Sequence, residues 1–203
     1  MSLQIQTFRE PPFDNNNYVV IDEESHEAIL VDCSAADETM MDYIKNQGAT
    51  LKYILITHAH FDHILGVDEV MKKYQVPAYV HPADFPLLQD MNGWLTRLGF
   101  PTATIPNLSP LLSTLKIGQT SIQVIPTAGH TPGCVCYLID NHLFSGDTLF
   151  RGTHGRVDIP LSDAQAIRES LLHLMELPDD ITVYPGHGHP TTIGNERGWI
   201  TRK

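Results

Sequence analysis

The sequence predicts a single-domain α/β (α+β) protein with a four-layer αββα architecture, in which two packed β-sheets lie between two layers of helices. Short strand-like runs occur in two clusters, and helix-like segments follow each cluster. The chain has 203 residues, of which 42% are hydrophobic, enough to bury one sizeable core. Because no linker-like or low-complexity stretch divides the chain, we expect one domain over residues 1–203.

The first half of the chain contains the first cluster of strand patterns. Three of them open the sequence, at residues 4–8, 18–22 and 28–32, and a polar turn indicates a hairpin between the last two. Ser34 is the expected N-cap of a helix over residues 35–47, which Gly48 would end. Two more strands and one more helix follow, at residues 51–56, 78–80 and 66–74.

Residues 84–113 lack the pattern of a core element. The segment contains Phe85, Trp94 and Phe100 among prolines and glycines, which favours a covering loop with partial helix. We therefore expect an insertion that covers part of the functional site as a lid, with simple packing on the surface as the alternative.

The second half of the chain contains the second cluster of strand patterns. Four of them come in close succession, at residues 115–117, 121–125, 135–139 and 142–144. Ser162 is the expected N-cap of a helix that continues to about Glu176, and a last strand is expected over residues 181–184. This second cluster with its helix completes the predicted sandwich.

The loop from Thr57 to His63 holds three histidines and one aspartate directly after a strand-like run. Neutral imidazole and ionised carboxylate are ligands that suit zinc and, to a lesser degree, iron or manganese. On an extended stretch His58 and His60 project to the same side, whereas Asp62 and His63 lie at the turn into a helix. The loop therefore predicts two adjacent metal positions.

Further candidate ligands follow three later strand patterns. His130, Asp147 and His187 each come just after an apolar run and stand among glycines or prolines. Loops held by a rigid scaffold can direct such residues toward a common point. We expect these three side chains to complete the two metal positions.

The order HxHxDH, then His, then Asp, then His strongly resembles the metallo-β-lactamase superfamily. Segments 145–150, 155–158 and 185–197 further resemble the short glyoxalase II-like (hydroxyacylglutathione hydrolase-like) hydrolases. The resemblance covers nearly the whole chain, and it implies the αββα fold of that superfamily. The chain is too short for the C-terminal helical domain of full-length glyoxalase II, so we do not expect that domain.

The resemblance implies two zinc ions per chain, with iron or manganese as alternatives at one or both positions. One metal would be bound by three histidines, His58, His60 and His130. The other would be bound by Asp62, His63 and His187, and Asp147 would bridge the two. A metal pair of this kind lowers the pKa of a shared water toward about 7. Asp62 and Asp147 would act in catalysis, the first by orienting the hydroxide and the second by holding the metals together.

The resemblance implies a small-molecule thioester substrate, such as an S-acyl-glutathione, and a hydrolytic enzyme. Arg156 stands where the glyoxalase II family has a basic residue that holds glutathione. Asp158 and His189 stand where that family uses tyrosines, so the glutathione pocket departs from the family pattern.

Other functions remain open at this point. Persulfide dioxygenases resemble the chain in the same motifs and bind one iron, here through His58, His130 and Asp147. A lactonase or another small-ester hydrolase is a further alternative. A non-enzymatic, metal-stabilised binding module is the least favoured, because it would predict a missing ligand.

Charge and composition exclude some partners. The net charge is −11 with only 13 Lys and Arg residues, which tells against a nucleic-acid partner because phosphate backbones require clustered cations. No apolar run approaches membrane-spanning length, and the first residues lack the signal-peptide pattern, so we expect a cytoplasmic protein without a membrane partner. The three cysteines fit a reducing compartment, Cys134 and Cys136 as small buried hydrophobic residues.

The remaining histidines have no metal-ligand spacing. Four of them are expected to have no metal role, namely His26, His81, His142 and His173. His154 and His189 lie in loops that resemble active-site loops, where contact with substrate or with a ligand competes with plain exposure.

Overall fold

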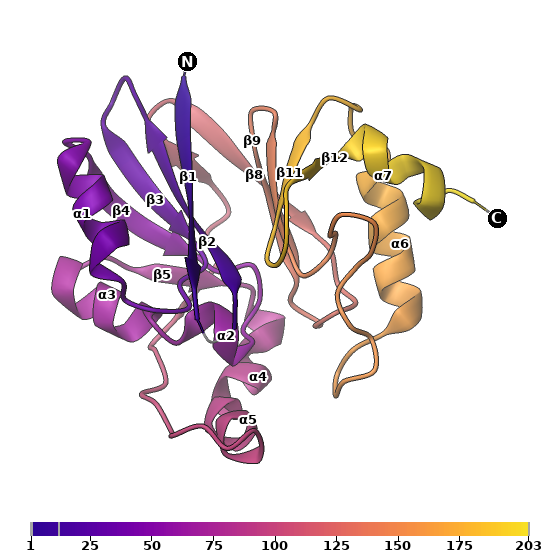
Figure 1. The fold of residues 1–203 in the computed structure, drawn as a ribbon, viewed down its shortest axis with the longest axis horizontal. Coiled ribbons are helices and arrows are strands. Elements are labelled where there is room, and N and C mark those ends of the chain that lie inside the picture. The colour runs from indigo at the N-terminus through magenta and orange to yellow at the C-terminus, as the bar shows by residue number, and fades with distance from the viewer. Residues whose placement is uncertain (1, 12, 203) are drawn as a thin grey trace.

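The computed structural model describes residues 2–11 and 13–202, and it places two six-stranded β-sheets face to face (Figure 1). The first sheet has the strand order β1 (Leu3–Glu10), β2 (Asn15–Asp22), β3 (Glu27–Val31), β4 (Thr50–Leu55), β5 (Ala78–Val80), β6 (Ser109–Pro110). The second sheet has the order β12 (Thr191–Thr192), β11 (Thr182–Pro185), β10 (His142–Gly146), β9 (Val135–Ile139), β8 (Thr120–Pro126), β7 (Leu115–Ile117).

Alternating side chains build the central layer between the two sheets. Along β3, Ile29 and Val31 face the second sheet, whereas Ala28 and Leu30 face the opposite way into a separate cluster under helices. This alternation has the period of two that a strand imposes, and both faces are apolar because both are covered. The inter-sheet cluster also contains the buried rings of Tyr18, Tyr137 and Phe144.

Helices cover the outer face of each sheet (Figure 1). On the first sheet lie α1 (Glu38–Asn46) and α3 (Val67–Tyr74), whose buried residues join one core cluster with the strands. On the second sheet lie α6 (Ala164–Leu174) and α7 (Ile193–Ile200), whose buried residues join another. The αββα prediction is confirmed.

Parallel pairing positions the loops that carry the candidate ligands. Strand β3 pairs in parallel with β4, and β4 pairs in parallel with β5, while β10 pairs in parallel with β11 in the second sheet. Because the carboxyl ends of parallel strands meet at one edge of a sheet, the loops after β3 and β4 lie together, as do those after β10 and β11.

The two predicted helix caps are wrong by a few residues. The N-cap of α1 is Asp37, whose carboxylate accepts a hydrogen bond from the Thr39 backbone amide, whereas Ser34 bonds to Asn17. The N-cap of α6 is Asp163, which accepts from two backbone amides of the first turn, and not Ser162. In both cases a serine that fits the cap pattern is occupied by another partner.

The segment 84–113 is more helical and more buried than expected. It follows the short 3₁₀ turn η1 (Pro82–Asp84) and contains α4 (Phe85–Gln89), α5 (Met91–Arg97) and β6. Asp84 is fully buried, and Leu87, Leu88, Met91 and Leu95 belong to the core cluster under the first sheet. The expectation that this segment contributes nothing to the core is therefore wrong.

The described chain is otherwise close to the predicted pattern. Helix α7 and the short strand β12 were not expected from the sequence, because they carry little apolar periodicity of their own. Cys134 and Cys136 are buried and unbonded to other cysteines, and burial raises the pKa of the Cys136 thiol to about 12. Among the described residues, no helix combines the length and apolar character needed to cross a membrane.

Candidate metal centre

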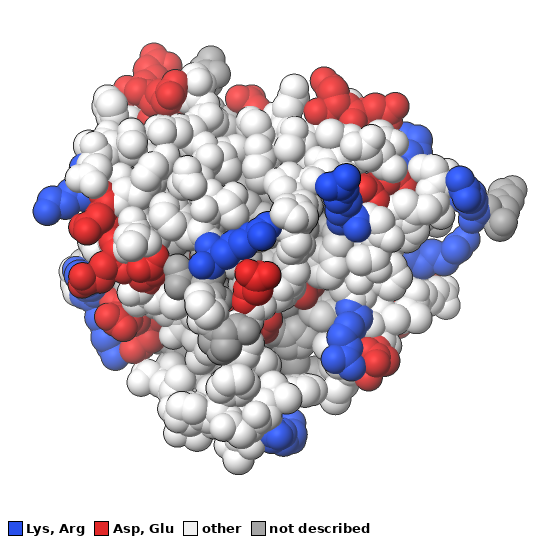
Figure 2. All heavy atoms as spheres, viewed as in Figure 1, with Lys and Arg blue, Asp and Glu red and all other residues white. Residues whose placement is uncertain are grey.

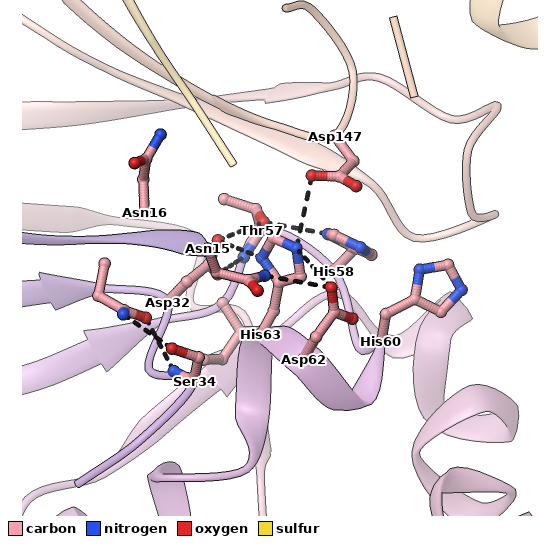
Figure 3. Close-up of polar contacts among 12 residues, drawn as sticks. Asn15, Asn16, Asp32, Ser34, Thr57, His58, His60, Asp62, His63 and Asp147 are labelled. Atoms are coloured by element: carbon pink, nitrogen blue, oxygen red, sulfur yellow. Dashed lines mark hydrogen bonds and ion pairs between the residues drawn. The ribbon is translucent and has the colours of Figure 1, made fainter. Parts of the chain in front are cut away.

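The structure brings all seven predicted metal ligands into one cluster, and Figure 3 shows how those from the first sheet converge with Asp147. Within the described chain, three groups have ligand atoms that all lie within 4.8 Å of one another. These groups are His58 with His60 and His130, Asp62 with His63 and His187, and His58 with His63 and Asp147.

The local geometry of the first loop follows from its position between β4 and α2 (Phe61–Ile64). His60 keeps an extended backbone, with φ −68° and ψ 144°, and α2 begins at the next residue. His58 and His60 therefore lie on one extended stretch, whereas Asp62 and His63 lie on the first helical turn and point to a second position. The expected divergence of the loop toward two positions is present.

Three ligand histidines are fixed through the ring nitrogen that faces away from the site. Nδ1 of His63 lies 2.8 Å from an oxygen of Asp32, Nδ1 of His130 lies 2.8 Å from the carbonyl oxygen of Arg156, and Nδ1 of His58 lies 3.2 Å from the hydroxyl of Thr57. Such partners set the ring orientation of metal-binding histidines. Nε2 of His58 and Nε2 of His63 have no hydrogen-bond partner among the described residues, whereas Nε2 of His130 lies 2.9 Å from Nδ1 of His60.

The carboxylate of Asp147 lies between the two histidine groups. Its Oδ1 is 3.4 Å from His63 Nε2, and its Oδ2 is 3.5 Å from His130 Nε2 and 3.7 Å from His187 Nε2. Ligand atoms around a tetrahedral zinc ion, with bonds of about 2.0–2.2 Å, are about 3.3–3.6 Å apart. The spacing of these atoms therefore suits metal coordination better than direct hydrogen bonding.

Several buried atoms of the cluster have no hydrogen-bond partner among the described residues. They are His58 Nε2, His63 Nε2 and Asp147 Oδ1, together with Oδ1 of the neighbouring Asn15. A buried polar atom without a partner costs about 1–3 kcal/mol, so such atoms seldom persist without a ligand. The residues present fit a metal pair, because the orphaned atoms of His58, His63 and Asp147 belong to predicted ligands.

The protonation of the histidines is consistent with this fit. Burial lowers the pKa of His60 to about 4, and burial together with the nearby imidazoles places the pKa of His58 far below its usual value. Both rings are therefore neutral at pH 7, which is the form that binds metal. For His63, burial opposes protonation, but the carboxylates of Asp32, Asp147 and Asp62 outweigh it and raise the pKa. The same carboxylates would be satisfied by a bound cation.

Asp32 is a site residue that the sequence analysis missed. Besides His63, its carboxylate accepts hydrogen bonds from the backbone amide and the hydroxyl of Thr57, both at 2.8 Å. Its backbone has φ 59°, in the left-handed region that is costly for residues other than glycine, although aspartate tolerates it better than most. In the sequence, Asp32 could have been recognised as a candidate because it directly follows a strand, as Asp147 does.

Asp84 is a second missed residue. It accepts hydrogen bonds from the Ala59 amide at 2.9 Å, the Thr131 hydroxyl at 2.8 Å and the Gly133 amide at 2.6 Å. Ala59 stands between two ligands and Thr131 follows His130, so one buried carboxylate ties together the two loops of the first metal group. Burial raises the pKa of Asp84, although these three donors favour its ionised form.

Asn15 and Asn16 connect the first sheet to the loop of His187. The Asn15 amide lies 3.2 Å from Asp62 Oδ2, and the Asn16 amide donates to the carbonyl oxygens of Pro185 and Gly188, both at 2.9 Å. Both asparagines are buried. The signal in the sequence was a run of three asparagines immediately before an apolar strand.

Two glycines allow the loops to approach the ligands. A Cβ at Gly155 would lie 2.0 Å from the backbone oxygen of Asp147, and a Cβ at Gly186 would lie 2.3 Å from Asp147 Oδ1. Any side chain at these positions would displace Asp147. Close packing against the predicted ligand Asp147 therefore explains why positions 155 and 186 are glycine.

A pocket of about 410 Å³ opens onto the cluster. Arg156 lines this pocket, but it is exposed and its Nε and Nη2 bond to the two carboxylate oxygens of Asp158, at 2.8 and 3.0 Å. His154 also lines the pocket, and His189 lines an adjoining groove. The other four histidines belong to none of the ligand groups found in the described chain.

Comparisons with known proteins agree with this geometry. The family model of the Metallo-beta-lactamase superfamily matches residues 11–187. Hydroxyacylglutathione hydrolase GloC of Haemophilus influenzae is 30% identical over 193 residues, which span 91% of this chain and 91% of that protein.

Solved structures give the same result. The B3 metallo-β-lactamase BLEG-1 is 33% identical with a TM-score of 0.89, over 98% of this chain and 100% of that one. TTHA1623, solved in a di-iron-bound form, is 33% identical with a TM-score of 0.84, over 95% of this chain and 96% of that one. The chain is therefore similar both to a metallo-β-lactamase and to a protein that was solved with two iron ions bound.

Proposed function

The chain belongs to the metallo-β-lactamase superfamily, and from that premise we propose that it is a dinuclear metal-dependent hydrolase whose substrate is a small thioester such as an S-acyl-glutathione. The thioester class is supported by the similarity to GloC and by the glyoxalase II-like motifs around Asp147, Arg156 and His187. The two metals are proposed to be zinc, with iron as the alternative that the di-iron relative supports.

The observation that carries the proposal is the position of Asp147. Its two carboxylate oxygens face histidines of both groups, Oδ1 toward His63 and Oδ2 toward His130 and His187. A site for a single iron, as in a persulfide dioxygenase, needs only two histidines and this aspartate. The second group, Asp62 with His63 and His187, would then have no role, although its atoms lie as close together as those of the first.

The residues of the cluster suit the hydrolysis of a thioester. Bound metals would supply Lewis acidity toward the substrate carbonyl and make water acidic enough to ionise near neutral pH. For Asp62, burial opposes ionisation, but the neighbouring His63 and His187 outweigh it and lower the pKa, so the carboxylate stays ionised. With Asn15 bonded to Oδ2, the ionised Asp62 can accept a hydrogen bond from the attacking water and orient it.

The overall reaction adds water across the acyl–sulfur bond. A carbon–oxygen bond forms at the acyl carbon and the carbon–sulfur bond breaks; one proton of water goes to the thiol sulfur, and the other is released to solvent from the carboxylic acid product. No serine or cysteine nucleophile is needed, and the buried Cys136 has a raised pKa that makes it unreactive.

Arg156 is the residue we propose to contact an anionic part of the thiol carrier. It lines the pocket, and a substrate carboxylate would have to replace Asp158 as its partner. Replacing Arg156 with alanine should then raise KM more than it lowers kcat, with a loss of about tenfold or more in kcat/KM. If Arg156 only supports its loop, the substitution would instead lower kcat or metal content and leave KM unchanged.

The proposed function is tested by comparing three reactions on one metal-analysed preparation. We expect hydrolysis of S-acetylglutathione and S-lactoylglutathione, measured by release of free thiol, to exceed both other activities. Oxygen consumption with glutathione persulfide that exceeds thioester hydrolysis would replace the hydrolase assignment with a dioxygenase. Faster cleavage of a chromogenic β-lactam would keep the metal-dependent hydrolase but exclude the thioester class.

A further inference from the structure

The pocket over the metal centre has two walls of different chemistry. One wall comes from helices α2 and α5 and consists of Phe61, Trp94 and Leu98. The other wall comes from the loop after β10 and is mixed; it consists of Phe150, Thr153, His154, Arg156 and Ile159. Figure 1 shows α5 and the loop after β10 at the same end of the molecule. The metal ligands lie between the two walls.

Buried side chains and hydrogen bonds fix the position of the wall formed by α2 and α5. Met91 and Leu95 anchor α5 in the core, where each is 1% exposed. The side chain of Asn92 bonds to both backbone groups of Ala103, at 2.9 and 3.0 Å, and this fixes the chain that returns from α5. The wall is therefore a prearranged surface and not a loose loop.

Phe61 is held by rings from two other segments. Its ring centroid lies 5.2 Å from that of Phe13, and Phe13 lies 5.0 Å from Phe100, both in edge-to-face contacts. Such pairs favour one arrangement of the rings beyond simple burial. The position of Phe61 beside the ligand Asp62 is therefore fixed by aromatic packing.

Trp94 is the residue of this wall that reaches the metal centre. Its ring lies 6.5 Å from that of the predicted ligand His60, and the guanidinium of Arg97 lies 5.4 Å from the indole on α5 itself. Arg97 is also paired with Asp90 at 3.1 Å, so its charge has partners on its own helix. Leu98 lines the same pocket, and 52% of its surface is exposed.

Charge is absent from this wall and present on the other. Among the described residues that line the pocket, the fixed cation is Arg156, which belongs to the mixed wall. Figure 2 shows few charged side chains over the end of the molecule where α4 and α5 lie. The lining side chains Phe61, Trp94 and Leu98 carry no charge, and the nearby Arg97 is paired with Asp90, so an apolar group on this wall would cover Trp94 and Leu98.

We propose that the substrate of this enzyme carries an apolar acyl group, which binds against Phe61, Trp94 and Leu98, while the polar thiol carrier lies along the mixed wall that includes Arg156. This inference rests on the proposed thioester hydrolysis and names the acyl class. Burial of each added methylene against this wall should raise kcat/KM by up to about fourfold. A small hydroxylated acyl group, such as lactoyl, should be a poorer substrate than an apolar acyl group of similar size.

The experiment compares S-acetyl-, S-butyryl- and S-hexanoylglutathione, which share one carrier, with the metal-loaded full-length protein. We expect kcat/KM for hexanoyl to exceed that for acetyl by about tenfold or more. Trp94→Ala should reduce this ratio about tenfold, and Leu98→Ala should reduce it about threefold. The matched control is Leu112→Ala, because Leu112 is 48% exposed but does not line the pocket, and it should leave the ratio unchanged.

A binding measurement separates this inference from the proposed function. The thioethers S-hexylglutathione and S-methylglutathione cannot be hydrolysed, so they report binding alone. The chain has two tryptophans, and in the Trp199→Phe variant the fluorescence therefore comes from Trp94 and reports binding at this wall. Tighter binding of the hexyl compound without any thioester hydrolysis would support the apolar acyl site and contradict the thioesterase. Thioester hydrolysis with equal rates for all acyl groups, or equal thioether binding, would overturn the apolar acyl site alone.

Discussion

Asp32 and Asp84 are buried carboxylates outside the predicted ligand set, yet each fixes the position of ligand residues. Asp32 holds the ring of His63 through Nδ1 and the ligand loop through Thr57. Asp84 accepts from the backbone amide of Ala59, between His58 and His60, and from the hydroxyl of Thr131, next to His130. At the scale of single residues, the geometry of the centre therefore depends on acceptors that lie one contact away from the ligands.

Replacing Asp84 with asparagine should weaken both folding and metal binding. Asp84 accepts hydrogen bonds from three donors, and the NH2 group of an asparagine would face one of these donors. At least one charge-assisted hydrogen bond is then lost, which should lower the free energy of unfolding by about 1–3 kcal/mol. Urea unfolding and zinc affinity of the same preparation measure the effect. The exposed Asp42, replaced in the same way, should change stability by less than about 0.5 kcal/mol. Equal effects of the two substitutions would remove the role assigned to Asp84.

Replacing Asp147 with alanine should lower metal content and abolish most thioester hydrolysis, because its carboxylate lies between the two histidine groups. The loss in kcat should be about a hundredfold or more, as expected when charge stabilisation at the reacting centre is removed. His173→Ala is the control, since His173 is exposed on α6 and belongs to no ligand group. A similar loss in both folded variants would show that the ligand assignment is wrong.

At the scale of secondary-structure elements, the strands were predicted well and the caps were not. Strands such as β3 and β9 alternate between two apolar clusters, and in the sequence they are short apolar runs bounded by turn residues, which indicate buried strands. The caps at Ser34 and Ser162 failed because an aspartate close behind each serine competes for the same role. Helices α4 and α5 were expected only as partial helix in a covering segment, because their buried faces depend on contacts with distant strands.

Replacing either of two glycines with alanine should change the stability of the protein, in opposite directions for the two positions. Gly155→Ala should destabilise the protein by about 1–3 kcal/mol and reduce metal binding, because the added Cβ would collide with the backbone of Asp147. Gly198→Ala should stabilise it by about 0.5–1 kcal/mol, because Gly198 is an exposed position within α7 with open space around it. Thermal unfolding of the two variants checks both signs, and a neutral Gly155→Ala would contradict the close packing described for this loop.

At the scale of the whole molecule, the two sheets meet so that ligands from both halves of the chain reach one point. Loops after β4, β8, β10 and β11 supply the ligands, and the bridge between Asn15 and His187 joins the first sheet to the last of these loops. The convergence of the seven predicted ligand side chains could be predicted, because these residues follow strands in a characteristic order. Segment 84–113 was expected to cover the site and Arg156 to contact substrate, but that Trp94 and Arg156 line one pocket could not be predicted, because they come from opposite halves and meet only in the folded chain.

The central claim, that this cluster binds a metal pair which the hydrolytic reaction requires, is tested most directly by metal stoichiometry measured together with activity. The protein is purified without added metal, analysed for transition metals, treated with a chelator and titrated back with zinc. The account predicts between about one and two ions per chain as isolated, loss of thioester hydrolysis on chelation, and recovery that is complete at about two ions per chain. Full activity in protein that holds less than about 0.2 ions per chain would contradict it.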